Sequence, residues 1–115
     1  MNGYSNGELW RVVQDPHEAD RVALRVDARP DGFTRLRWRP YDGFSECFSQ
    51  YRVMVGIGST PATVLTVISD QSAAEIATDA LHAGTTYQLR VQAMRSTTLG
   101  SFVVGQTKTT TYTVP

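Results

Sequence analysis

Few side chains in this 115-residue sequence have the types and spacing that catalysis or metal binding requires. The chain has one cysteine, Cys47, and two histidines, His17 and His82, which lie far apart along it. A cysteine nucleophile needs a histidine beside it and a further group to orient that histidine, and a structural metal needs several thiolate or imidazole ligands at close spacing. Neither pattern occurs. We therefore expect no catalytic residue, no metal ligand and no cofactor, and we interpret Cys47 as a half-buried structural thiol.

The other candidate motifs are weak as well. The loop VGIGST at 55–60 contains two glycines, but no helix pattern follows it, as a phosphate-binding loop requires. The formal net charge is zero, which argues against a nucleic-acid partner because such proteins carry a basic excess on one face. No apolar run approaches the roughly 20 residues of a membrane helix, so we also expect no membrane insertion.

The elements available to position functional side chains are short strands. Side chains alternate between the two faces of a strand, so apolar residues at every second position predict a strand with one buried face. In 34–40, for example, Leu36 and Trp38 share one face. The Ala-rich segment 72–81 has helix propensity, but its place in a series of short strands favours a strand. The same analysis predicts further strands at 21–26, 49–58, 61–69, 85–95 and 101–111.

Seven short strands with no predicted helix or repeat are typical of an all-β fold, namely a seven-stranded Greek-key β-sandwich of the immunoglobulin-like class. The stretch LHAGTTY at 81–87 supports this interpretation. In such sandwiches a tyrosine near the start of the penultimate strand sends its hydroxyl back to the backbone a few residues upstream. Leu81, Gly84 and Tyr87 have the spacing of this tyrosine corner, with Gly84 free to adopt a positive φ.

Four motifs in order along the chain resemble those of the fibronectin type III family. They are LRW with Trp38, YRV with Tyr51 and Val53, the corner LHAGTTY, and the alternating run YQLRVQA that begins at Tyr87. The loop PYDGF, which precedes YRV, is similar to that of bacterial members of the family. The resemblance assigns structural roles to Trp38, Tyr51, Leu81, Gly84 and Tyr87.

The resemblance also implies domain boundaries and a class of function. Residues 21–111 would form the domain, 112–115 a C-terminal linker, and 1–20 either an N-terminal linker or an extra strand along an open sheet edge. The domain would be a non-catalytic spacer or protein-binding module of a larger multidomain protein, outside the cell or in the cell envelope. Its partners would be neighbouring domains of the same chain, another protein or a second copy.

An alternative role is that of an accessory module for polysaccharide beside a glycoside hydrolase. Such a module needs exposed aromatic side chains lined up on one face. The aromatic residues available for it are Trp10, Tyr41, Phe44 and Phe48.

One surface feature with a possible partner is a basic stripe, Arg35, Arg37 and Arg39. We expect these arginines to pair across the strands with acidic neighbours rather than with a partner. The acidic neighbours are Asp27, Glu75 and Asp79.

The other surface feature is the outward face of the strands at 49–58 and 85–95. Arginine and methionine, which are enriched at protein interfaces, gather on this face without an acidic residue among them. The adjacent segment 61–69 is apolar on both faces, so we expect an exposed row of valine or leucine beside the patch. The residues predicted to bind a partner are Arg52, Met54, Arg90 and Met94.

Overall fold

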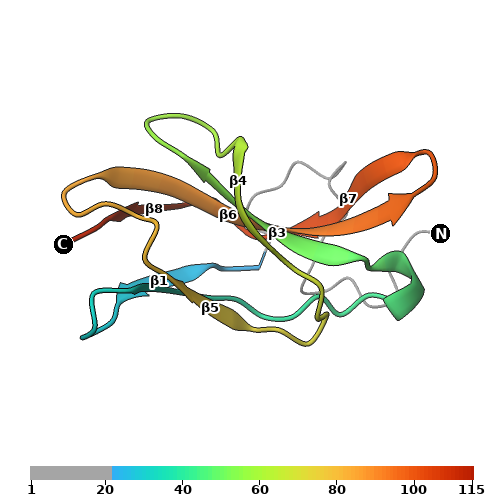
Figure 1. Cartoon of the computed structure of the whole chain (residues 1–115). Coiled ribbons are helices and arrows are strands. Elements are labelled where there is room, and N and C mark those ends of the chain that lie inside the picture. Colours follow the sequence, from blue (N-terminus) through green and yellow to red (C-terminus); the bar gives the residue numbers. More distant parts are fainter. Residues whose placement is uncertain (1–21) are drawn as a thin grey trace.

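The computed structural model describes residues 22–115 as an all-β fold in which two antiparallel sheets face each other (Figure 1). The smaller sheet has the order β1-β2-β5, with bounds β1 (Arg25–Ala28), β2 (Thr34–Arg37) and β5 (Glu75–Thr78). The larger sheet has the order β4-β3-β6-β7, and β8 also pairs with β6. Its strands are β3 (Gln50–Gly56), β4 (Thr63–Ile68), β6 (Thr86–Thr97), β7 (Gly100–Gln106) and β8 (Thr110–Thr113). The predicted linker or strand at 1–20, with Trp10 and His17, lies outside the described residues.

The hydrophobic core lies between the two sheets and follows the predicted alternation. Every second residue of a strand faces inward, so the larger sheet contributes Tyr51 and Val53 from β3 and Leu89 and Val91 from β6, all fully buried. Leu36 of β2 is their fully buried counterpart in the smaller sheet. The prediction of an all-β sandwich is confirmed by this arrangement.

Three connections cross from one sheet to the other. They join β2 to β3, β4 to β5, and β5 to β6, whereas β1–β2, β3–β4 and β6–β7 are neighbouring antiparallel pairs within a sheet. The connection between β2 and β3 contains a 3-10 turn, η3 (Ser45–Cys47), which is the only helical element among residues 22–115. Figure 1 shows that β3 and β6 begin at opposite ends of the molecule, so crossing connections lie at both ends.

The chain contacts the larger sheet before it enters β1 of the smaller sheet. The Lys108 amide donates to the Val22 carbonyl at 2.8 Å, and the Thr110 hydroxyl donates to the Leu24 carbonyl at 3.0 Å. Val22 forms a parallel bridge with Thr107. Residues 22–24 are therefore attached to the larger sheet, and β1 then pairs with β2 in the smaller one.

The predicted strand at 101–111 consists of two strands, β7 and β8. Thr107 separates them: its amide donates to the Val91 carbonyl at 2.9 Å, and its hydroxyl accepts the Val91 amide proton at 3.0 Å. Because a side chain takes the place of a backbone carbonyl, the regular ladder stops there and resumes at β8. Sequence alternation does not reveal such a break, since Thr suits either strand.

The Ala-rich segment 72–81 contains the four-residue strand β5, and no helix. It pairs antiparallel with β2, with Ile76 opposite Leu36. Ile76 packs against the core. Tertiary packing therefore overrides the local helix propensity of the alanines.

Candidate binding surface

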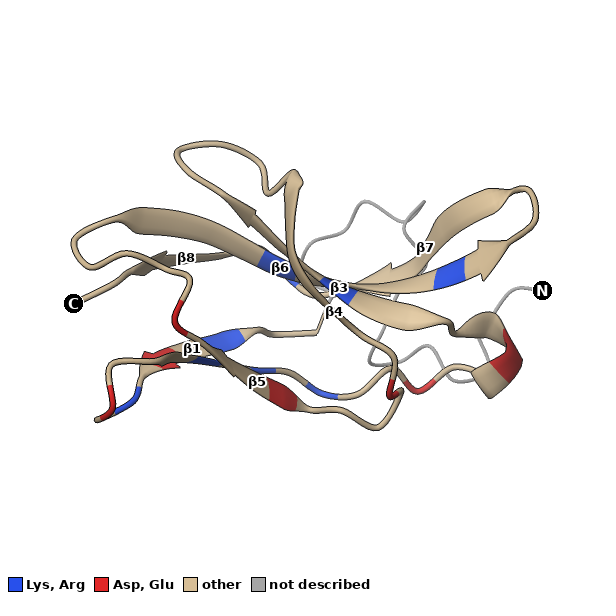
Figure 2. Ribbon diagram, viewed as in Figure 1, with Lys and Arg blue, Asp and Glu red and all other residues tan. Residues whose placement is uncertain are grey.

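The outer face of the larger sheet is the surface predicted to bind a partner. Figure 2 shows basic residues on β3 and β6 of this sheet, whereas most of the charged residues lie on the smaller sheet and its loops. Antiparallel pairing places Arg52 opposite Gln92 and Met54 opposite Arg90. The sequence-predicted residues of β3 and β6 are thus neighbours, as their strand parity requires.

The two methionines of this face are not open to solvent. Met54 is 7% exposed and Met94 is 1% exposed. The prediction that they form an accessible surface is therefore wrong. Strand parity determines the side of a sheet to which a residue points, but it does not determine how much of that side is covered. Neither methionine belongs to the core cluster between the sheets.

The two arginines of this face are engaged in a row of polar side chains. Arg52 Nη2 donates to Gln92 Oε1 at 3.1 Å, and Gln92 Nε2 donates to Gln106 Oε1 at 3.1 Å. Gln106 Oε1 also accepts from Arg90 Nη1 at 3.2 Å. Thr109 Oγ1 completes the row by accepting from Arg90 Nε at 3.1 Å and from Nη2 at 2.6 Å. These bonds run from β3 across β6 to β7 and hold both guanidinium groups against the sheet.

A hollow of about 340 Å³ lies beside Arg90. The loop between β3 and β4 forms one wall and the start of β6 the other. Its lining residues are Gly58, Ser59, Thr60, Pro61, Gln88, Arg90 and Thr109. The Arg90 guanidinium group donates hydrogen bonds to Thr109 and Gln106, and it is the only charged group among the residues that line the hollow. Among residues 22–115 no group of three potential metal-ligating side chains comes together.

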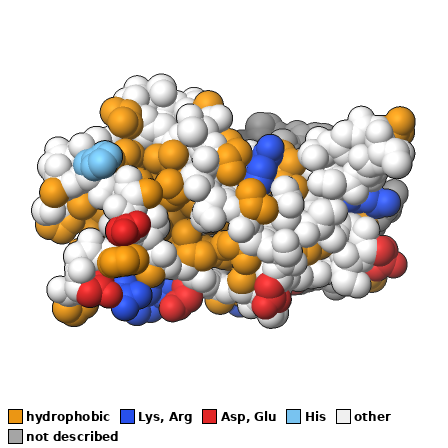
Figure 3. Space-filling view, viewed as in Figure 1, with side chains coloured by type: hydrophobic (Ala, Val, Ile, Leu, Met, Phe, Trp, Pro, Cys, Tyr) orange, Lys and Arg blue, Asp and Glu red, His pale blue; other side chains and the backbone are white. Residues whose placement is uncertain are grey.

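The exposed apolar row expected beside this face is present on β4. Val64 is 43% exposed and Val67 is 46% exposed, whereas Leu65 and Ile68 pack against the core. Hydrophobic side chains are visible over β4 and between β4 and β5 in the space-filling view (Figure 3). The exposed apolar side chains beside this face are therefore Val64 and Val67 of the β4 border, whereas the two methionines are covered.

Tyr51 joins two connections of the chain through its buried hydroxyl group. Its hydroxyl accepts the Tyr41 amide proton at 2.7 Å and donates to the Gln71 carbonyl at 2.6 Å. Gln71 Nε2 in turn donates to the carbonyls of Tyr41 at 3.1 Å and Gly43 at 3.0 Å. Burial raises the pKa of the Tyr51 hydroxyl above its ordinary value. One side chain of β3 thus fastens the β2–β3 connection to the β4–β5 connection.

Trp38 and Phe48 surround the Tyr51 ring. Their ring centroids lie 5.5 Å and 4.7 Å from that of Tyr51, both edge to face. Trp38 is 5% exposed, in keeping with the structural role assigned to it. Sequence analysis identified Trp38 and Tyr51 but missed Gln71, which has no periodic signal and lies 20 residues from Tyr51. Its position after Asp70, in a turn between two strands, was the available clue.

The stretch 81–87 forms the tyrosine corner that its spacing predicts. The Tyr87 hydroxyl accepts the His82 amide proton at 2.9 Å, and Leu81 is buried. Gly84 has a φ of +81° and donates to the Val114 carbonyl at 2.8 Å. The β5–β6 connection is therefore fastened to the start of β6 and to the end of the chain after β8.

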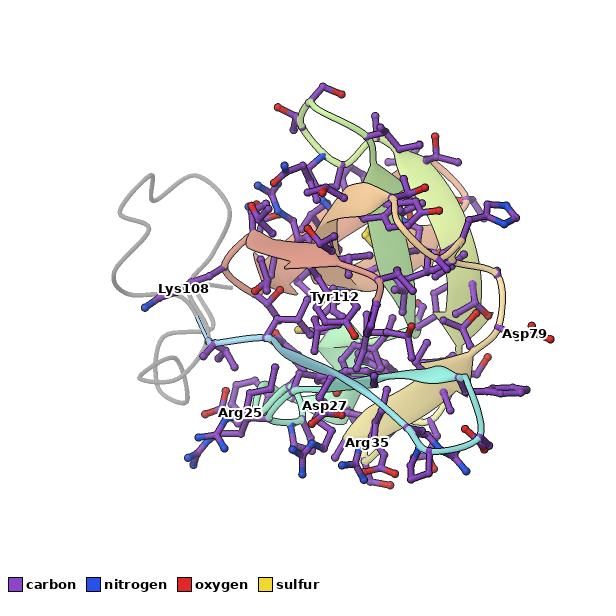
Figure 4. The ribbon with its side chains drawn as sticks, turned by 90° about the vertical axis from the view of Figure 1, so that its left-hand side faces the viewer. Arg25, Asp27, Arg35, Asp79, Lys108 and Tyr112 are labelled. Atoms are coloured by element: carbon purple, nitrogen blue, oxygen red, sulfur yellow. The ribbon has the colours of Figure 1, made fainter. Side chains whose placement is uncertain are left out.

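The basic stripe on β2 pairs chiefly with one carboxylate. Asp27 accepts from Arg35 Nε at 3.1 Å and from Arg37 Nη2 at 3.0 Å. The hydrogen bond from Arg35 is the main cause that lowers the pKa of Asp27 and raises that of Arg35. Figure 4 shows Asp27 and Arg35 together, with Asp79 well away from them. Asp79 is thus not the cross-strand neighbour that the sequence suggested, since it lies beyond the end of β5.

The remaining candidates for chemistry or sugar binding are dispersed. Cys47 is buried rather than half-buried, and His82 is an exposed loop residue. Of the aromatic residues considered for polysaccharide binding, Tyr41 is buried and stacks on the half-buried Phe48 at 6.1 Å between ring centroids. Phe44 is 46% exposed. These described aromatic residues do not form a row on an open face.

The part of the chain that the structure describes contains no helix of the length and hydropathy of a membrane span. Comparison with protein-family models, with curated proteins and with solved structures found no match to this sequence.

Proposed function

We propose that this chain is a fibronectin type III-like Greek-key β-sandwich that acts as a rigid, non-catalytic spacer within a larger exported protein. The observation that carries the proposal is the common direction of its first and last described segments. Val22 bridges Thr107 in parallel, and residues 22–24 then follow the chain from Lys108 to Thr110. In Figure 1 β1 and β8 run toward the same end. A chain that enters and leaves in one direction separates its neighbours instead of bringing them together.

The family assignment is supported by strand order and by the two tyrosines. In the family the second strand lies between the first and the fifth, and β2 lies between β1 and β5 here. The Tyr87 hydroxyl bonds five residues upstream, at the corner before the long strand β6. Trp38 and Tyr51, which carry two of the sequence motifs, pack edge to face in the core.

Rigidity, which a spacer needs, is supported by the bonds of the crossing connections. Tyr51 fastens two of them and Tyr87 fastens the third. Both hydroxyls bond to backbone groups, so each bond restrains the backbone of a connection directly.

A spacer is favoured over a module that binds proteins through the predicted face. Met54 and Met94 are buried, and Arg52 and Arg90 bond within the sheet. A partner at this face would meet guanidinium groups that already take part in hydrogen bonds within the sheet.

The spacer role can be tested by small-angle X-ray scattering on two full copies of the chain joined in series, with the exposed Val64 and Val67 changed to lysine in both copies so that their β4 strands do not associate. Data extrapolated to zero concentration would be compared with those of a single copy. We expect the maximum dimension to grow by a length comparable to the 43 Å long axis of one domain. A tandem particle hardly longer than the single copy would contradict the proposal, because it would mean that the copies fold back side by side.

A further inference from the structure

The strand β4 forms a border of the larger sheet. Among the described residues it pairs only with β3. In an antiparallel sheet the backbone N–H and C=O groups of a border strand point alternately inward and outward, so the outward ones have no partner in the sheet. Such a row of groups can accept another strand.

A register shift gives β4 an unusual pattern of facing. Val64 pairs with Met54 and Val67 pairs with Arg52, both on the outer face, while Leu65 is left over between the two pairings. The extra residue means that Leu65 and Thr66 both lie between the two outward valines. Leu65 and Ile68 pack against the core, and Thr66 lies opposite the buried Val53. From Thr63 to Ile68 the order is inward, outward, inward, inward, outward, inward, which reads the same in both directions.

The strand also lacks the charges that usually protect a border. The segment 58–69, GSTPATVLTVIS, has no charged residue, whereas β1 contains Arg25 and Asp27 and β5 contains Glu75. Figure 2 shows no charged residue on β4. The exposed Val64 and Val67 add apolar area on its outer face. Natural proteins commonly place charged residues, lysine above all, on such strands to prevent pairing, and β4 has none from Thr63 to Ile68.

We propose that β4 is a self-association edge, at which it pairs antiparallel with β4 of a second copy of this chain around a two-fold axis between Leu65 and Thr66. This register places Val64 opposite Val67 of the second copy, twice by symmetry, on the outer face. It also places Leu65 opposite Thr66 and Thr63 opposite Ile68, all on the core-facing side. The two larger sheets then become one continuous sheet. The inference concerns a different surface from the spacer role and does not rest on it.

The second copy is the occupant because the pattern is self-complementary. In an isologous contact, if residue i of the first copy meets residue j of the second, then residue j of the first copy must also meet residue i of the second. A facing order that reads the same in both directions satisfies this condition at every position. The absence of charge from 58–69 means that the segment meets itself without like-charge repulsion.

Sedimentation velocity over a concentration series tests the association. We expect the sedimentation coefficient of the full chain to rise toward that of a dimer and to change little with salt, because backbone and apolar contacts are weakly screened. The double variant Val64→Lys plus Val67→Lys should stay at the monomer value. Leu99→Lys is the matched control, since Leu99 is 89% exposed on the β6–β7 hairpin, and it should associate as the parent does. A monomeric parent, or a double variant that still associates, would overturn the proposal.

Disulfide crosslinking tests the register. Val64→Cys and Val67→Cys would be made separately in a Cys47→Ala background, each checked by its thermal melt against that background. Mild oxidation of the mixed proteins should give a covalent dimer of one of each, and neither protein alone should crosslink. Crosslinking of Val64→Cys with itself, or no crosslink in the mixture, would show that the proposed pairing is wrong.

Discussion

At the scale of single residues, two tyrosine hydroxyls connect parts of the chain that no strand pairing joins. Tyr51 and Tyr87 both sit at inward positions of β3 and β6, and both bond to backbone groups of crossing connections. Each hydroxyl therefore satisfies buried polar groups and fixes a connection at the same time. Tyr112, by contrast, is half-buried between the sheets, opposite Tyr87 on β8 (Figure 4).

Replacing Tyr51 by Phe should lower the free energy of unfolding by about 1 to 3 kcal/mol, because the Tyr41 amide and the Gln71 carbonyl then lose their buried partner. Chemical denaturation would measure the loss. Tyr112→Phe is the matched control and should be close to neutral. Equal losses for the two variants would mean that the Tyr51 bonds do not stabilise the fold.

The ion pairs of Asp27 should make stability depend on pH at the acid end. Its folded pKa lies below the ordinary value of 3.8 because Arg35, and to a lesser degree Arg37, bond to the carboxylate. A lowered folded pKa stabilises the protein above pH 3.8 and loses that contribution as the pH falls through the folded pKa. Asp27→Asn should therefore be less stable than the parent at pH 7, and the difference should shrink toward pH 2.

Denaturation of both proteins at several pH values would measure this difference, and added salt should reduce it at pH 7 because the pairs are partly exposed. A difference that stays constant from pH 7 to pH 2 would show that Asp27 is not the group responsible.

At the scale of elements, features that depend on local spacing could be predicted from the sequence, whereas features that depend on long-range contacts could not. The tyrosine corner was predictable because Leu81, Gly84 and Tyr87 lie within seven residues of each other. The Tyr51 cluster was not, because Gln71 belongs to another connection, and its place in a turn after Asp70 does not reveal that it bonds to Tyr41 and Gly43. The inward residues of β3 and β6 followed from alternation, whereas the burial of Met54 and Met94 depends on what covers the outer face.

The boundaries of the strands show the same limit. The break between β7 and β8 arises because the Thr107 hydroxyl accepts the Val91 amide proton, and alternation in the sequence continues through it. The register shift in β4 likewise leaves no mark in a run of apolar residues. The break between β7 and β8 and the register shift in β4 both depend on how a strand meets its partner strand. They are therefore determined by tertiary structure rather than by local sequence.

The conformation of the β5–β6 connection can be tested at Gly84. A Cβ there would meet nothing within 4 Å, so the effect of a substitution comes from its φ of +81° alone. Gly84→Ala should cost about 1 to 2 kcal/mol, and Gly84→Asn less, because Asn tolerates the left-handed region better. Thermal melts would give the order parent, Asn, Ala. A Gly84→Ala variant as stable as the parent would mean that this position does not need a positive φ.

At the scale of the whole molecule, a rigid spacer needs connections that are held as firmly as the strands. The described domain is elongated, with extents of 43 × 26 × 24 Å. In Figure 1 β3 begins near one end and β6 near the other, so the Tyr51 and Tyr87 bonds lie toward opposite ends. A spacer with both ends fixed transmits the direction of the chain from Val22 to Val114, which a sandwich with loose connections would not do.

Amide hydrogen exchange by NMR on the full chain measures how firmly the crossing connections are held. The Tyr41 and His82 amides lie outside every strand, yet each donates to a tyrosine hydroxyl. We predict that both exchange as slowly as the core amides of β6. Tyr51→Phe should speed exchange at Tyr41 alone, and Tyr87→Phe should speed it at His82 alone. If both amides of the parent exchange at the rate of an open loop, the connections are not fixed and the rigid-spacer account is contradicted.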